Sequence, residues 1–159
     1  MSPLYTSPQI TLTFEAESRL VRYVRTNVPY PSLAEYEQLH ERAGAALDQL
    51  GRKRHVLLVD MREATLNNDP AFERAAVRCR QLLVHDFRKM AVLVKTAVGA
   101  LQIGRHIRED SLEAPVFNDE TAAVSYLLGV SGFDAEAPAS SSRPPRSSRR
   151  FGPGSGPVR

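Results

Sequence analysis

Apolar and polar residues alternate near the start of the chain, and this period of two is typical of a β-strand with one buried face. Ile10, Leu12 and Phe14 alternate with threonines and predict a first strand. Residues 19–25 predict a second strand, joined to the first as a hairpin. Three later apolar runs predict buried strands, at residues 56–59, 90–94 and 114–117.

Between these strands, apolar residues recur at spacings of three and four, which predicts amphipathic helices. Ser32 and Glu35 form the S-x-x-E pattern of a capping box, and Gly51 is placed to end the helix that follows. Asp69 and Pro70 predict a second helix start, because aspartate accepts bonds from free backbone N–H groups and proline has no donor to lose there. The predicted helices cover residues 33–50, 70–84, 96–108 and 119–128.

The elements therefore follow the order ββαβαβαβα, which predicts an α/β domain with a mixed sheet and helices packed on it. We expect an N-terminal arm over residues 1–9, the α/β domain over residues 10–130 and a disordered tail over residues 131–159. The tail is rich in Ser, Pro, Arg and Gly, and such a segment cannot bury enough apolar surface to offset its conformational entropy.

The charge of the chain is unevenly placed. Residues 134–159 contain five arginines and two acidic residues and so account for the whole net charge of +3. Residues 1–133 are neutral overall. The tail can contact nucleic-acid phosphates weakly, but a neutral folded part argues against a dedicated nucleic-acid domain. No apolar run is long enough to span a membrane, and the N-terminus lacks the basic and apolar regions of a signal peptide. A cytoplasmic protein is therefore expected.

No combination of residues matches a catalytic or metal-binding motif. The histidines are scattered without ligand spacing, and His40 and His85 are expected at the surface. Cys79 is the only cysteine and is expected to be a buried thiol, not a nucleophile. The inward residues of the second and third helices are predicted to be Phe72, Ala76, Cys79, Leu83, Leu101, Gly104 and Ile107.

Asp60 at a strand end and Lys95 after the next strand resemble the phosphorylated Asp and the Lys of response-regulator receivers. The acidic pair that such receivers carry after their first strand is missing, so no Mg²⁺ site is expected. The stretch from Asp60 to Glu63 is interpreted instead as a local charge cluster. We expect no enzyme, no cofactor and no metal.

The element order, the VLLVD strand before a helix start and the closing PVFNDETAAVSYLLG segment resemble the STAS domain (sulfate transporter and anti-sigma factor antagonist) over about residues 9–130. The resemblance implies a STAS-like fold and a bacterial regulatory or scaffolding module that binds a protein partner through the loop before its second helix. Members of that family switch binding by phosphorylating a serine in this loop.

The loop of this chain departs from the family pattern. Residues 66–70, LNNDP, contain no hydroxyl group, and Thr65 is the nearest residue that has one. Switching by phosphoserine is therefore not expected, and whether Thr65 is modified stays open. The chain is closer to a branch of small bacterial proteins that resemble sporulation anti-sigma factor antagonists, lack the phosphorylation site and are sometimes linked to apolar or lipid ligands.

The predicted partner-binding surface combines this loop with one face of the second helix. A helix N-terminus offers free N–H groups to acidic or carbonyl groups, and two arginines one turn apart add bidentate donors. The alternatives are that the aspartate is only a helix cap and that the helix face is only solvated. The candidate residues are Arg62, Thr65, Asn67, Asn68, Asp69, Arg74 and Arg78.

A second hypothesis is a carrier of a small molecule or lipid, with an apolar pocket between the sheet and the helices. Four aromatic residues are placed to line one side of such a pocket, and they are equally compatible with an ordinary core. They are Tyr23, Tyr30, Tyr36 and Phe72. The identity of a protein partner and the formation of a homodimer both stay open.

Overall fold

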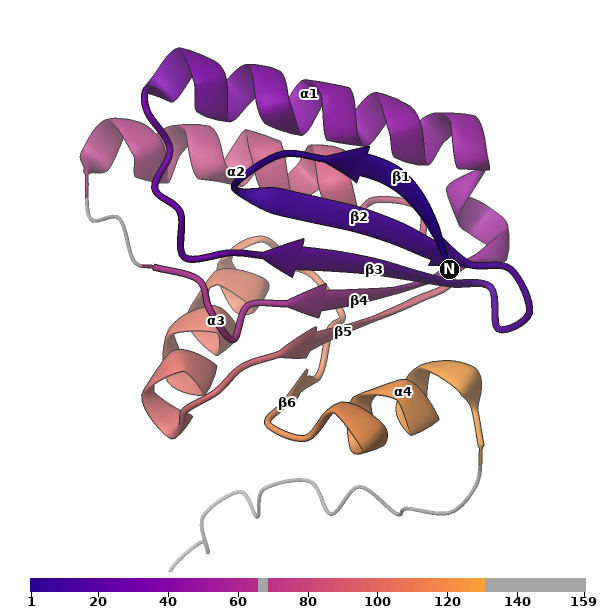
Figure 1. The fold of residues 1–159 in the computed structure, drawn as a ribbon. Coiled ribbons are helices and arrows are strands. Elements are labelled where there is room, and N and C mark those ends of the chain that lie inside the picture. The colour runs from indigo at the N-terminus through magenta and orange to yellow at the C-terminus, as the bar shows by residue number, and fades with distance from the viewer. Residues whose placement is uncertain (66–68, 131–159) are drawn as a thin grey trace, which may run out of the picture.

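The computed structural model describes residues 1–65 and 69–130, and in them one six-stranded sheet carries helices on both faces (Figure 1). The predicted α/β class with a mixed sheet is confirmed. The strands are β1 (Ser2–Thr6), β2 (Ile10–Glu15), β3 (Leu20–Arg25), β4 (Val56–Asp60), β5 (Lys89–Leu93) and β6 (Val116–Phe117). The helices are α1 (Leu33–Leu50), α2 (Pro70–Val84), α3 (Ala97–Glu109) and α4 (Glu120–Leu128), with a 3₁₀ turn, η1 (Arg52–Arg54). The predicted tail, Asn67 and Asn68 lie outside the described residues.

The strands lie in the sheet in their chain order. β1, β2 and β3 pair antiparallel, and β3 to β6 pair parallel, so every parallel connection crosses over through a helix. Tyr23 of β3 lies opposite Val59 of β4, and Val59 lies opposite Val92 of β5. This register lines up the carboxyl ends of three parallel strands, which is where open α/β sheets place their ligands.

The first residues of the chain correct one prediction. Residues 2–6, expected to belong to an arm, form β1 and pair with β2 from Ser2 opposite Phe14 to Thr6 opposite Thr11. The ladder shifts between Pro3 and Tyr5. β1 is a half-exposed edge strand with a proline in it, so it has no alternation of apolar and polar residues by which the sequence could predict it.

The helices begin and end where the sequence predicts, because local caps hold their ends. The Ser32 hydroxyl accepts a bond from the backbone N–H of Glu35 at 3.2 Å, and Gly51 ends α1 in the left-handed conformation at φ 82°. The Asp69 carboxylate accepts a bond from the N–H of Ala71 at 2.7 Å and caps α2. Thr96 and Asp119 cap α3 and α4 in the same way.

Two apolar clusters sandwich the sheet. α1, α2 and α3 pack on one face, over a cluster that includes Leu12, Leu47 and Leu57, whereas α4 packs on the other face through Ala123 and Leu127 (Figure 1). The successive residues of β4 alternate between the two clusters, as expected for a strand buried on both sides.

Two side-chain predictions are wrong. Leu101, expected inward, is 75% exposed, and α3 instead packs through Ala100, Ile103 and Ile107. These three positions follow the three-and-four spacing of one helix face, whereas Leu101 lies on the opposite side. His40, expected at the surface, is 3% exposed, because α1 places it one turn after Tyr36 on the buried face.

Candidate functional site

A cavity of about 490 Å³ lies on the α1, α2 and α3 side of the sheet, at the carboxyl ends of β3, β4 and β5. Its volume falls within the range of about 300–1,000 Å³ that is typical of small-molecule sites. Its floor comes from the strands, through Leu57, Val59 and Val92, and its walls come from the three helices. Pro29, Thr65 and Glu73 are exposed lining residues and mark where the cavity reaches solvent.

One wall of the cavity is aromatic. The ring of Tyr36 packs edge-on against Tyr30 with centroids 4.6 Å apart, and it also contacts His40 at 4.3 Å and Phe72 at 5.4 Å. Tyr23, from β3, completes this side. The four aromatic residues that the sequence proposes for a pocket therefore all line one cavity, although they come from four different segments of the chain.

The tyrosine hydroxyls of this wall stay protonated at neutral pH. Burial raises the pKa of Tyr23, Tyr30 and Tyr36, and a nearby Arg25 charge only partly opposes that rise. Burial also lowers the pKa of His40 to about 4, so its imidazole is neutral. The Nδ1 atom of His40 lies 2.7 Å from the Tyr36 carbonyl oxygen, which as the acceptor fixes the ring. The wall thus combines aromatic surface with neutral polar groups.

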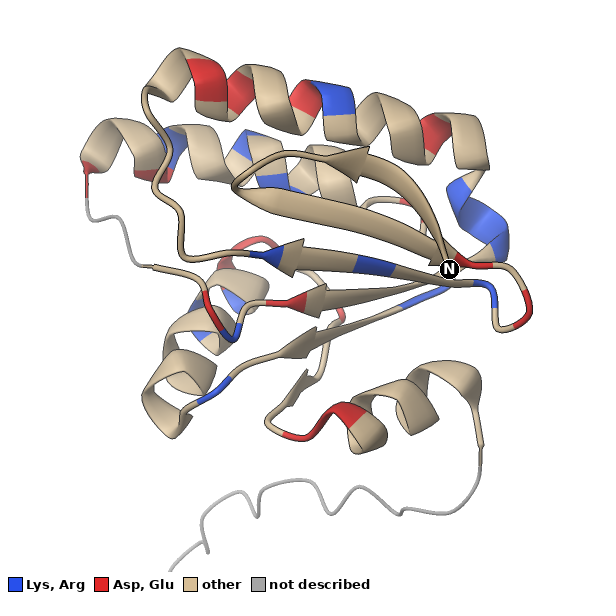
Figure 2. Ribbon diagram, in the orientation of Figure 1, with Lys and Arg blue, Asp and Glu red and all other residues tan. Residues whose placement is uncertain are grey.

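Arg25 is the buried cation of the cavity. It is 5% exposed, and its Nη1 atom donates to the carbonyl oxygens of Gln9 at 3.0 Å and Thr26 at 2.6 Å. Its guanidinium lies over the ring of Tyr30, 4.3 Å from the centroid. β3 alternates its side chains, so Arg25 faces the same side as Val21 and Tyr23. Figure 2 shows the two basic positions of β3 in blue, Arg22 and Arg25.

A second cation in the lining is fully compensated. Arg80 of α2 donates to both carboxylate oxygens of Asp110, at 2.6 and 3.2 Å, and the Asp110 side chain is buried. This bidentate pair joins α2 to the end of α3 and leaves that part of the cavity wall neutral.

The residues predicted for a partner surface divide between different parts of the molecule. Arg74 and Arg78 are exposed on α2, and Arg78 pairs with Glu41 of α1 at 3.2 Å. Asp69 caps α2 and Thr65 lines the cavity mouth. Arg62 instead lies on the face of the sheet that α4 covers, where no part of α2 packs.

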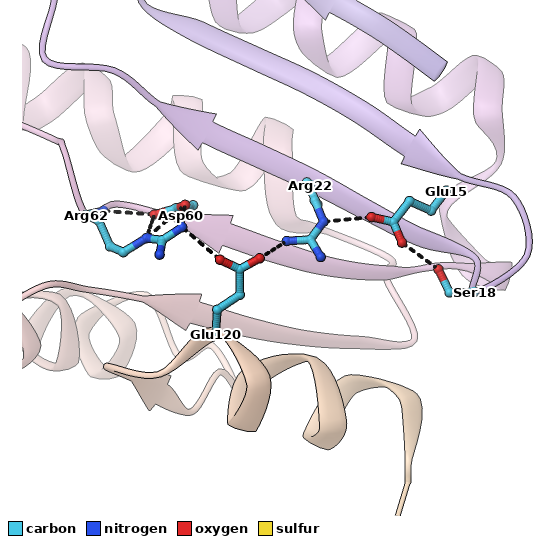
Figure 3. Close-up of polar contacts among 6 residues, drawn as sticks. All are labelled: Glu15, Ser18, Arg22, Asp60, Arg62 and Glu120. Carbon is cyan, nitrogen blue, oxygen red and sulfur yellow. Dashed lines mark hydrogen bonds and ion pairs between the residues drawn. The ribbon is translucent and has the colours of Figure 1, made fainter. Parts of the chain in front are cut away.

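A chain of charged side chains holds Arg62 there (Figure 3). Its guanidinium donates to the Asp60 carboxylate at 2.6 Å and to Glu120 of α4 at 2.9 Å. Glu120 also accepts from Arg22 at 2.6 Å, and Arg22 donates to Glu15 at 2.9 Å. In Figure 3 the chain runs from Glu15 of β2 through Glu120 of α4 to Asp60 of β4, and its hydrogen bonds raise the pKa of Arg62, first through Asp60. The predicted charge cluster around Asp60 is confirmed as a tie between the sheet and α4.

The remaining features to consider are the single cysteine, possible metal ligands and possible membrane-spanning helices. Cys79 is buried, and burial raises the pKa of its thiol to about 11, so it is a neutral thiol at neutral pH. Within residues 1–65 and 69–130, no three His, Cys, Asp or Glu side chains gather where they can hold a metal ion. In the same part of the chain, no helix combines the length and the apolar character needed to cross a membrane.

No family model, curated protein or solved structure matches this chain. The STAS resemblance of the sequence therefore stays a prediction, and the proposed function rests on the geometry of the site.

Sequence reasoning missed the polar groups of the cavity. The position of Arg25 could have been predicted, because it follows Val21 and Tyr23 at a spacing of two and so falls on the same side of its strand. The Arg80–Asp110 pair could not, since Arg80 lies in α2 and Asp110 at the end of α3, and the two meet only in the folded chain.

Proposed function

We propose that this protein is a non-catalytic module that binds a small, mainly apolar molecule in the cavity between the sheet and α1, α2 and α3. The observation that carries the proposal is the cavity itself, about 490 Å³ in volume and lined by Tyr23, Tyr30, Tyr36 and Phe72. Apolar walls with a few fixed polar groups are characteristic of small-molecule sites.

Of the two hypotheses from the sequence, this proposal prefers the carrier of a small molecule to the partner-binding module. The predicted partner surface gains less support, because Arg62 and the α2 arginines lie on opposite faces of the sheet. A ligand-binding role also agrees with the expectation that the chain resembles the branch of STAS-like bacterial proteins without a phosphorylatable serine. A cytoplasmic regulatory setting belongs to the same proposal.

The proposal is tested by filling the cavity. Ala76 lines it from α2, so Ala76→Phe adds a ring inside the space that a ligand needs. We expect 1-decanol, titrated by isothermal calorimetry, to bind the wild-type chain and to bind Ala76→Phe at least tenfold more weakly. Unchanged binding in the variant means that the cavity is not the site.

Val77→Phe is the matched control. Val77 follows Ala76 on α2, is 40% exposed and does not line the cavity. The same ring added there leaves the cavity open, so we expect 1-decanol to bind as in the wild type. A loss of binding in both variants points to a disturbed α2 and contradicts the assignment.

Binding of a protein partner through α2 is the second candidate function. The observation in its favour is that Arg74 and Arg78 are exposed on α2 together with Val77, which is 40% exposed. An exposed apolar side chain on the same helix as exposed arginines is a composition found in protein interfaces.

A further inference from the structure

We infer that the ligand of this cavity carries a carboxylate that pairs with Arg25, with an apolar body directed toward the strands and α3. The inference rests on the proposed function and specifies its ligand class. It begins from a charge that the protein itself leaves uncompensated.

Arg25 has no carboxylate partner within the part of the chain that the structure describes. No Asp or Glu oxygen of residues 1–65 and 69–130 lies within 4.0 Å of its guanidinium nitrogens. Its hydrogen bonds to described residues all start from Nη1 and reach only neutral oxygens. A buried cation is costly unless an opposite charge compensates it, so the site favours an anion that enters with the ligand.

The other deeply buried arginine among the described residues is paired, since Arg52 is 4% exposed and donates to Asp48 at 2.7 Å. The cavity-lining Arg80, whose side chain is 29% exposed, donates to Asp110. Within residues 1–65 and 69–130, the fold therefore supplies a carboxylate to each of these two cations but not to Arg25. The difference locates the free positive charge at the aromatic end of the cavity.

The groups around Arg25 are suited to a carboxylate. Its guanidinium lies over Tyr30, whose ring packs against Tyr36 and His40 with centroids 4.6 and 5.8 Å away, and Tyr23 lines the same cavity. The hydroxyls of Tyr23 and Tyr30 hydrogen-bond to each other, and they are neutral, as is the imidazole, so none of these groups brings a competing charge. Charge-assisted hydrogen bonds from a guanidinium and hydroxyl groups to a carboxylate are among the strongest in proteins.

The rest of the lining is suited to an apolar body. Away from Arg25 the cavity is bounded mainly by aliphatic side chains, namely Leu47, Leu57, Val59, Leu83, Val92 and Ile103. Two charged features lie there, the neutralised Arg80–Asp110 pair and Glu73 at the exposed rim. The Glu73 carboxylate repels a second carboxylate on the ligand. An apolar monocarboxylate with its head at Arg25 matches both ends of the cavity.

Decanoate and 1-decanol test the inference as a matched pair, since they differ in the head group alone. We expect the wild-type chain to bind decanoate at least tenfold more tightly than 1-decanol at neutral pH, measured by isothermal calorimetry. Arg25→Met keeps an unbranched apolar stem and removes the guanidinium charge, and it is expected to bring the ratio of the two affinities to within about twofold of one.

Arg54→Met is the control for net charge. Arg54 is exposed in η1 and does not line the cavity, so its replacement is expected to leave the preference for decanoate intact. Arg25→Lys keeps the charge and is expected to keep a preference of the same sign, which separates the charge from the hydrogen bonds that hold Gln9 and Thr26.

The outcomes distinguish the inference from the proposed function. Equal binding of both compounds by the wild type overturns the inference that the ligand carries a carboxylate, and it leaves the proposed apolar site in place. Failure of both to bind overturns the proposed function as well. The ratio of the two affinities in the wild type tests the carboxylate even where Arg25→Met does not fold. If Arg54→Met loses the preference for decanoate as much as Arg25→Met does, the preference comes from overall charge, and the role of Arg25 is overturned.

Discussion

Buried polar side chains in this protein are held by backbone carbonyl groups as much as by opposite charges. Arg52 donates to the carbonyls of Gly44 and Leu83, at 2.9 and 3.0 Å, and so satisfies acceptors in α1 and at the end of α2. Gly44 also lets α2 approach α1 closely, because an added Cβ would lie 3.3 Å from the Leu82 carbonyl oxygen. Among the described residues, every fully buried side-chain nitrogen or oxygen has a hydrogen-bond partner.

His40 gives a prediction at this scale. Its pKa is about 4 in the folded chain and 6.5 as an unperturbed group, so the unfolded state takes up a proton first as the pH falls. The wild type is expected to lose up to about 3 kcal/mol of unfolding free energy between pH 6.5 and pH 4 from this residue. His40→Leu is expected to lose correspondingly less, as measured by urea unfolding across that range.

His85→Leu is the control for this measurement, because His85 is exposed beside Asp86. It should retain the acid dependence of the wild type. An identical acid dependence in His40→Leu and the wild type would show that burial of this imidazole does not set the stability of the fold in acid.

At the scale of elements, α2 separates the cavity from solvent. Phe72 and Ala76 line the cavity, while Arg74 and Arg78 are exposed on the same helix. A helix cap, an apolar inner face and a charged outer face are thus combined in fifteen residues. The same helix can therefore serve both the proposed ligand and the second candidate function, a partner surface.

Charge reversal tests that surface. Arg74→Glu with Arg78→Glu is expected to abolish capture of the native partner while the thermal midpoint stays within a few degrees. The fold is expected to survive because, within the part of the chain that the structure describes, these two residues form one ion pair, Arg78 with Glu41. That pair is largely exposed, and such pairs contribute about 0–1 kcal/mol.

The matched variant is Arg54→Glu with Arg88→Glu, two exposed arginines outside α2. It changes the net charge equally and should still capture the partner. A folded α2 variant that retains the same partner with unchanged affinity would mean that this helix face is only solvated.

At the scale of the whole molecule, the sheet separates two differently built halves. The α1, α2 and α3 side contains the larger apolar cluster and the cavity, while the α4 side has a smaller cluster next to the charged chain from Glu15 to Asp60. Both clusters are formed by residues between Leu4 and Leu128. Among the described residues, the packing that holds the sheet comes from within that range.

Truncation at residue 133 tests the expectation, drawn from composition, that the remaining Ser/Pro/Arg/Gly-rich residues are not needed for folding. We expect the shortened chain to unfold cooperatively, with a thermal midpoint within a few degrees of the full chain, as measured by calorimetry. A broad transition or a large drop in the midpoint would show that residues after 133 contribute to the packing.

The sequence by itself determined the four helices, with ends within one residue of those observed, and five of the six strands. Periodicity and caps such as Ser32, Gly51 and Asp69 act over three or four residues, so they can be recognised without the fold. The aromatic lining was also accessible in part, because Tyr23, Tyr36 and Phe72 fall on predicted inner faces. β1 escaped prediction since an edge strand with Pro3 has no buried face to impose a period.

Only the tertiary structure decided which of these residues meet. The cavity exists because three helices and the ends of three parallel strands leave space between them, and such a space depends on packing distances that no local pattern contains. The same holds for the burial of His40, for the Arg80–Asp110 pair and for the separation of Arg62 from α2. That none of the described carboxylates pairs with Arg25 is likewise a property of the assembled neighbourhood, because charge compensation depends on distance in space and not along the chain.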